Sequence, residues 1–198
     1  MAEKKKFYPV SIDLLGREIE LLGTSLEDLD KRFVKIDLSP ELRGKSVELK
    51  FQVYLDSGKA HTNPVQWLIM GSYIRRMVRK GTDYVEDSFV AKCKDSNLRI
   101  KPFLITRKKV SRRVKAGLRN AAREYLKDYV KDKNFSHILL DLINMRLQKD
   151  LGLKLKKIYP LALCEIRIIK RIGEVEESDS LEKENRNLKE SEDNTKEK

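Results

Sequence analysis

The sequence predicts an α+β fold, in which an antiparallel β-barrel-like unit packs against helices and is followed by a disordered acidic C-terminal tail. Three observations predict it. Apolar residues alternate with period two between about residues 7 and 107, recur with a period of about 3.6 from residue 108 onward, and become scarce after residue 173. We therefore expect a basic N-terminal arm over residues 1–9, a single domain over residues 10–173 and a tail over residues 174–198.

The strands are predicted from alternation and from turn residues. The clearest strand covers residues 46–55 and ends at Asp56-Ser57-Gly58-Lys59, a hairpin signal that returns the chain over residues 59–67. A second hairpin is predicted from residues 85–94 and 98–106, with the turn at 95–97. Earlier strands are expected at 16–22 and 32–38, and a last strand at 161–172 returns to the sheet.

Three helices are predicted. The first covers residues 68–80, with Gly81 in the position of a C-cap. The second covers residues 108–132, and the third covers residues 135–149. The apolar stripe expected to face the core in the second helix consists of Val110, Val114, Leu118, Ala121, Ala122, Tyr125 and Tyr129.

Charge divides the chain into two parts. The 198 residues hold 43 Lys and Arg against 31 Asp and Glu, a formal net charge of +12. Residues 174–198 hold ten acids and five bases, so the excess of positive charge belongs to residues 1–173. A body this basic indicates a polyanionic partner. The tail has too few apolar residues to fold alone; it is either a shield for the basic body or a solvated extension.

Several classes of protein are disfavoured. The sequence has no apolar run of about 18 residues and no signal-peptide core, so a cytoplasmic protein without membrane contact is expected. Cys93 and Cys164 are expected to be buried free thiols. With only His61 and His137, and without a metal-ligand cluster, a phosphate loop or a nucleophile motif, we expect no catalytic residue, no metal, no cofactor and no small-molecule substrate.

The strongest functional signal is a basic segment. Residues 107–133 contain eleven bases and only three acids. Cations recur every four residues along the helix, where they repel each other, so the stability of the helix does not explain them. Binding to phosphate groups explains these cations, because each phosphate that a cation neutralises releases counterions. The predicted nucleic-acid contacts of this segment are Arg107, Lys108, Lys109, Arg112, Arg113, Lys115, Arg119 and Arg123.

Two smaller basic clusters extend the prediction. Arg75, Arg76, Arg79 and Lys80 end the first helix, where cations also complement the helix dipole. Lys4, Lys5 and Lys6 resemble a basic arm that folds onto RNA. The aromatic residues Tyr8, Trp67, Tyr73 and Tyr84 are expected in the core rather than stacked on bases.

The chain resembles the small-subunit ribosomal protein family eS-one, formerly S-three-A-e, over residues 10–173. The resemblance is carried by GREI at 16–19, LDKRFVKIDL at 29–38, KFQV at 50–53, and IYPL at 158–161 leading into EIR at 165–167. It implies a β-barrel-type domain with packed helices, a structural role on the platform of the small subunit near the messenger RNA exit, and small-subunit ribosomal RNA, neighbouring ribosomal proteins and messenger RNA as partners.

Matched to the family, the RNA contacts fall on residues 107–119 and 75–80. The chain lacks the long basic N-terminal extension of eukaryotic members, which favours an archaeal-type protein. It also has WLIM at 67–70, where the family would be more polar. Three alternatives stay open on the residues alone: an RNA or DNA chaperone, a metal-dependent nuclease, and an adaptor whose basic face binds an acidic protein.

Overall fold

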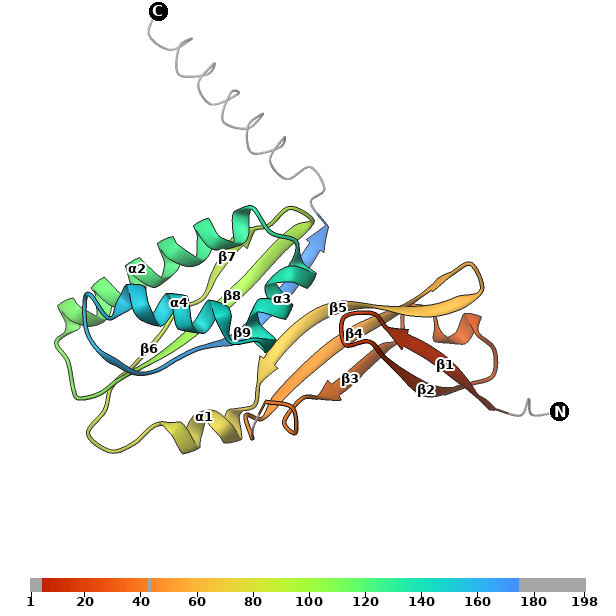
Figure 1. Cartoon of the computed structure of the whole chain (residues 1–198), viewed down its shortest axis with the longest axis horizontal. Coiled ribbons are helices and arrows are strands. Elements are labelled where there is room, and N and C mark those ends of the chain that lie inside the picture. The colour runs from red at the N-terminus through yellow and green to blue at the C-terminus, as the bar shows by residue number, and fades with distance from the viewer. Residues whose placement is uncertain (1–4, 43, 175–198) are drawn as a thin grey trace, which may run out of the picture.

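A computed structural model describes residues 5–42 and 44–174, which form one mixed sheet with helices on it (Figure 1). The predicted α+β class is confirmed. The predicted tail lies outside the described residues except for Glu174, which ends the last strand. Of the predicted arm, residues 1–4 are likewise outside, and residues 6–9 belong to the first strand.

The N-terminal half is built of strands. They are β1 (Lys6–Ile12), β2 (Arg17–Gly23), β3 (Phe33–Asp37), β4 (Val47–Asp56) and β5 (Lys59–Ile69), with the 3-10 helix η1 (Glu27–Leu29) between β2 and β3. The predicted β4–β5 hairpin is confirmed. All pairs in this half are antiparallel except β1 with β5, which run parallel at Val10↔Ala60 and Ser11↔His61. The long connection between β1 and β5 makes a parallel pair possible.

The C-terminal half carries the helices. Its elements are α1 (Gly71–Met77), β6 (Tyr84–Glu86), β7 (Phe89–Lys92), β8 (Ser96–Thr106), α2 (Arg112–Lys131), α3 (Phe135–Ile143), α4 (Arg146–Leu155) and β9 (Leu161–Glu174). The predicted final strand is confirmed, because β9 pairs with β8 along most of its length and with β5 at residues 168–170. Helix α2 packs on β6 and β7, and α4 packs on β9 (Figure 1).

The first predicted helix was too long, and its predicted cap was wrong. Leu68 and Ile69 belong to β5, and α1 ends at Met77, followed by Val78 in an extended conformation. Gly81 has a positive φ of 89°, but it lies in the following turn rather than at the helix end. Arg79 and Lys80 therefore lie in a loop and do not complement the helix dipole.

The third predicted helix was wrong as a single helix. The chain forms α3 and α4, separated at Asn144 and at Met145, whose φ is 56°. The buried Gln148 stabilises the break, because its side-chain N–H donates to the carbonyl of Leu142 at 3.1 Å. This bond satisfies a carbonyl near the end of α3.

The second predicted hairpin differs in its first strand. Residues 84–92 form two short strands, β6 and β7, interrupted at Asp87 and Ser88. Both strands pair with β8, which already begins at Ser96 in the predicted turn. The interruption leaves the carboxylate of Asp87 beside α2, where it binds an arginine described below.

The main core spans both halves. It joins residues of β4 and β5 to β8, β9 and the buried faces of α2, α3 and α4. In α2 the buried residues are Leu118, Ala122, Leu126 and Val130. The predicted stripe included Leu118 and Ala122, but it named Tyr125 and Tyr129 in place of Leu126 and Val130. Cys93 is buried and Cys164 is half-buried, and both thiols are free. Burial raises the pKa of the Cys164 thiol to about 12.

Trp67 joins the two halves. It is 1% exposed, and its indole N–H donates to the carbonyl of Ile166 in β9 at 3.0 Å. Tyr73 is also buried, so core packing is confirmed for these two aromatic residues. Tyr84 is 54% exposed and stacks on Phe103, with ring centroids 5.9 Å apart.

We predict that Trp67→Phe lowers the free energy of unfolding by about 2 to 4 kcal/mol, because it removes buried volume and the indole hydrogen bond to the Ile166 carbonyl. Urea denaturation followed by circular dichroism measures this change. A matched substitution, Phe51→Leu, removes buried volume from β4 without removing a hydrogen bond. Equal losses in the two variants would show that the indole bond contributes nothing.

Candidate nucleic-acid interface

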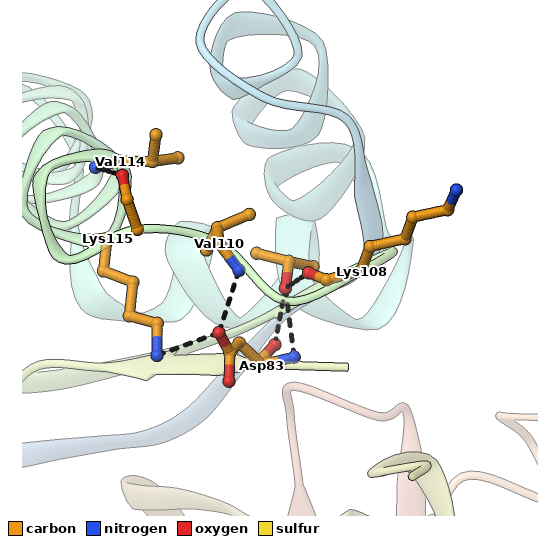
Figure 2. Close-up of polar contacts among 7 residues, drawn as sticks. Asp83, Lys108, Val110, Val114 and Lys115 are labelled. Carbon is orange, nitrogen blue, oxygen red and sulfur yellow. Dashed lines mark hydrogen bonds and ion pairs between the residues drawn. The ribbon is translucent and has the colours of Figure 1, made fainter. Parts of the chain in front are cut away.

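Asp83 connects the loop before β6 to the start of α2 (Figure 2). It ends the loop between α1 and β6, and its carboxylate accepts the backbone N–H of Val110 at 3.0 Å and pairs with the ammonium of Lys115 at 3.0 Å. These contacts, the Val110 bond first and Lys115 second, hold the pKa of the Asp83 carboxyl below its ordinary value.

The backbone at Asp83 is bound to the buried Thr106. The Thr106 N–H donates to the Asp83 carbonyl at 2.8 Å, and the Asp83 N–H donates to the Thr106 hydroxyl oxygen at 3.2 Å. The same hydroxyl lies 2.7 Å from the carbonyl oxygen of Lys108, to which it can donate. The end of the loop between α1 and β6 is therefore attached to the start of the loop between β8 and α2.

This attachment brings two of the predicted basic clusters together. The turn that precedes Asp83 carries Arg79 and Lys80, and is closed by the Thr82 N–H, which donates to the Arg79 carbonyl at 3.2 Å. The loop from Thr106 into α2 carries the second cluster. We call the combined surface the basic edge; it consists of the exposed residues Arg79, Lys80, Arg107, Lys108, Lys109, Arg112, Arg113 and Arg119.

The start of α2 holds cations where a helix favours anions. Ser111 is the N-cap, and its hydroxyl accepts the N–H of Val114 at 3.5 Å. Arg112 and Arg113 follow in the first turn, which has no acidic residue. Cations there oppose the helix dipole, which favours negative charge at the N-terminus. An external anion would remove this conflict.

Two predicted contacts have partners inside the molecule. Arg123 forms a two-pronged pair with Asp87 at 2.9 and 2.8 Å, and this pair holds the pKa of the Asp87 carboxyl below its ordinary value. Lys115 is bound to Asp83 as described. Within residues 5–42 and 44–174, the eight members of the basic edge have no side-chain hydrogen bond or ion pair.

The remaining predicted contacts lie elsewhere. Arg75 and Arg76 are exposed on α1, where Arg76 lies 3.4 Å from the Ser46 hydroxyl and 5.7 Å from the Tyr73 ring. Lys6 begins β1 at the opposite end of the long axis from the start of α2, with Lys5 just before it (Figure 1). Lys4 lies outside the described residues.

A groove beside Arg107 adds two cations that the sequence analysis did not include. Its volume is about 480 Å³, and Lys149 and Lys156 of the α4 region line it together with apolar residues such as Leu153 and Leu161. No acidic residue lines this groove. The signal for these lysines was their seven-residue spacing, about two helical turns, but the predicted helix ended at Lys149 and left out Lys156.

The described residues contain no group of three or more His, Cys, Asp or Glu side chains that could hold a metal ion. None of the described helices is long and apolar enough to cross a bilayer. Asp83 and Asp87 each bind a cation of α2.

Comparison with known proteins decides the family. The model of the Ribosomal S3Ae family matches residues 11–174. The chain belongs to the Ribosomal S3Ae family. Membership makes it a structural component of the small ribosomal subunit and not an enzyme, and the expected family resemblance is confirmed.

Three similar proteins come from archaea. The small ribosomal subunit protein eS1 of Methanothermobacter thermautotrophicus is 27% identical over 172 residues, 83% of this chain and 88% of the relative. The protein of the same name from Nanoarchaeum equitans is 36% identical over 97 residues, 48% of this chain and 49% of the relative. That from Haloarcula marismortui is 25% identical over 174 residues, 83% of this chain and 81% of the relative.

We predict that Asp83→Asn lowers the thermal unfolding midpoint at about pH 7, because it removes the charge that pairs with Lys115. Since the pKa of the folded carboxyl is lowered, its stabilisation is present above the ordinary carboxyl pKa of about 3.9 and is lost as the pH falls through the folded pKa. The midpoints of wild type and variant should converge on acidification.

Thermal scans by circular dichroism between about pH 7 and pH 3 test this linkage. Asp128→Asn, an exposed change in α2, controls for the loss of one acidic residue. A difference from wild type that stayed constant with pH would mean that the Asp83 charge does not stabilise the loop.

Proposed function

We propose that this family member binds small-subunit ribosomal RNA through the basic edge. The supporting observation is that the basic edge gathers eight exposed cations while the nearby carboxylates of Asp83 and Asp87 are occupied by Lys115 and Arg123. The free cations would neutralise phosphates, and the arginines can each bind two phosphate oxygens at once. Most of the binding energy would then come from release of counterions.

Recognition would depend mainly on the shape of the folded RNA. Phosphate contacts fix register and orientation but carry no sequence information. The bonds from Asp83 to Val110 and Thr106 hold the two basic loops in one arrangement, so the cations would meet phosphates at fixed relative positions. Lys115 and Arg123 would support the edge from within, and Arg75, Arg76, Lys4, Lys5 and Lys6 would contact RNA outside it.

The position on the ribosome follows the family resemblance. We place the chain on the platform of the small subunit, near the messenger RNA exit and the 3′ end of the small-subunit RNA, in contact with neighbouring ribosomal proteins and close to messenger RNA. The basic edge would face the ribosomal RNA there, and no turnover or cofactor would be involved.

Reversing three charges of the basic edge tests the proposal. We expect Arg112→Glu, Arg113→Glu and Arg119→Glu together to weaken binding to a small-subunit ribosomal RNA transcript at least about tenfold at moderate salt. The slope of log affinity against log salt should fall by about 3, because each lost phosphate contact removes close to one unit. Filter binding over a range of salt concentrations measures both.

The matched control reverses three exposed cations away from the edge, Lys31, Lys59 and Arg146. It changes the net charge equally, so a similar loss in the control would show that only total charge matters. Unchanged affinity in the Arg112, Arg113 and Arg119 variant would remove the basic edge from the RNA site. Circular dichroism verifies that each variant is folded.

A further inference from the structure

A row of six residues, five of them polar, crosses the sheet at one level. Five consecutive strand pairs place these residues directly opposite one another: Lys35 with Lys50, Lys50 with Gln66, Gln66 with Lys170, Lys170 with Arg99, and Arg99 with Val90. Four of the six residues are cations, and none is acidic. We call Lys35, Lys50, Lys170 and Arg99 the cationic row.

The cationic row lies on the face of the sheet that points away from the core. Paired residues of adjacent strands project from the same face, and chain neighbours project from opposite faces. The neighbours Leu49, Ile100 and Ile169 are fully buried in the core that the helices cover. Arg99 and Lys170 are exposed, so α2 and the cationic row occupy opposite faces of the sheet.

Placing cations directly opposite one another does not stabilise the sheet. Like charges directly opposite in a sheet destabilise it, and the row contains two such pairs, Lys35 with Lys50 and Lys170 with Arg99. Lys35 has an acidic partner, Glu48, at 3.1 Å. In the part of the chain that the structure describes, Arg99 and Lys170 form no ion pair.

The surroundings favour RNA over an acidic protein. From Lys35 to Arg99 the row crosses four strand intervals, or about 19 Å, with Gln66 between its two pairs of cations. At its β3 end the ring of Phe33 is 50% exposed and has the Lys50 ammonium 3.8 Å from its centroid. Cations that follow a backbone, combined with an exposed aromatic ring on which a base can stack, are typical of surfaces that bind unpaired RNA.

We propose that the cationic row is a second RNA-binding surface, which binds the phosphates of an RNA segment distinct from the one on the basic edge, with Phe33 available to stack on an unpaired base. The proposal rests on the proposed function, because it takes RNA as the polyanion. The sheet would then lie between two RNA segments, one on each side.

The double variant Arg99→Glu and Lys170→Glu tests this proposal in the full chain. With a small-subunit ribosomal RNA transcript as the probe, we expect affinity to fall at least about fivefold and the salt slope to fall by about 2. Hydroxyl-radical footprinting should show loss of one protected RNA segment. The segment that the Arg112, Arg113 and Arg119 variant loses should stay protected.

The control Lys59→Glu with Arg146→Glu changes the net charge by the same amount on other surfaces. If the row variant matches this control in affinity, salt slope and footprint, the proposal is overturned while the basic edge stands. Unchanged RNA binding with loss from assembled small subunits also overturns it, and assigns the row to a protein neighbour. A wild-type chain that binds no RNA overturns the proposed function and this inference together.

A second variant keeps the test independent of folding. If circular dichroism shows that the Glu variant is unfolded, Arg99→Gln with Lys170→Gln removes the charges and also the repulsion between them. We expect this variant to unfold at a temperature equal to or above that of wild type, and still to lose the second protected segment. Retention of that segment overturns the proposal.

Discussion

Strand β5 determines how the two halves of the molecule are joined. One of its edges pairs with β4 over its whole length, whereas the other edge pairs first with β1 and then, from Gln66 to Leu68, with β9. The change of partner makes a single sheet from an N-terminal strand unit and a C-terminal unit that carries helices. Trp67 stabilises this junction through its bond to Ile166, and the pair of Lys45 with the buried Glu165 adds a second connection between the halves.

Within the C-terminal half, two carboxylates determine which cations of α2 are bound inside the molecule and which can bind a polyanion. Asp83 and Asp87 lie at the ends of β6 and bind Lys115 and Arg123, which are eight residues, or about two helical turns, apart. Arg119 lies between them in the sequence and, among the described residues, forms no side-chain hydrogen bond or ion pair. The same pattern of cations at every fourth position therefore attaches the helix to the sheet and leaves charge for a polyanion.

Local patterns in the sequence predicted the elements that depend on local order. The alternation of β4, the return of β9 and the centre of the α2 stripe at Leu118 and Ala122 were all readable. The break between α3 and α4 was not, because it depends on the left-handed conformation of Met145 and on the contact of Gln148 with Leu142. The bond of Asp83 to Val110 and the pairing of Lys170 with Arg99 connect residues far apart, so they follow only from the pairing of the strands.

The position of Trp67 makes the molecule its own optical reporter. It is the single tryptophan of the chain, and it lies where β5 of the N-terminal half meets β9 of the C-terminal half. Its emission is therefore free of background from other indoles and responds to water reaching the β5–β9 contact. Separation of the halves can be distinguished from loss of helices, which circular dichroism follows, without attaching any label to the chain.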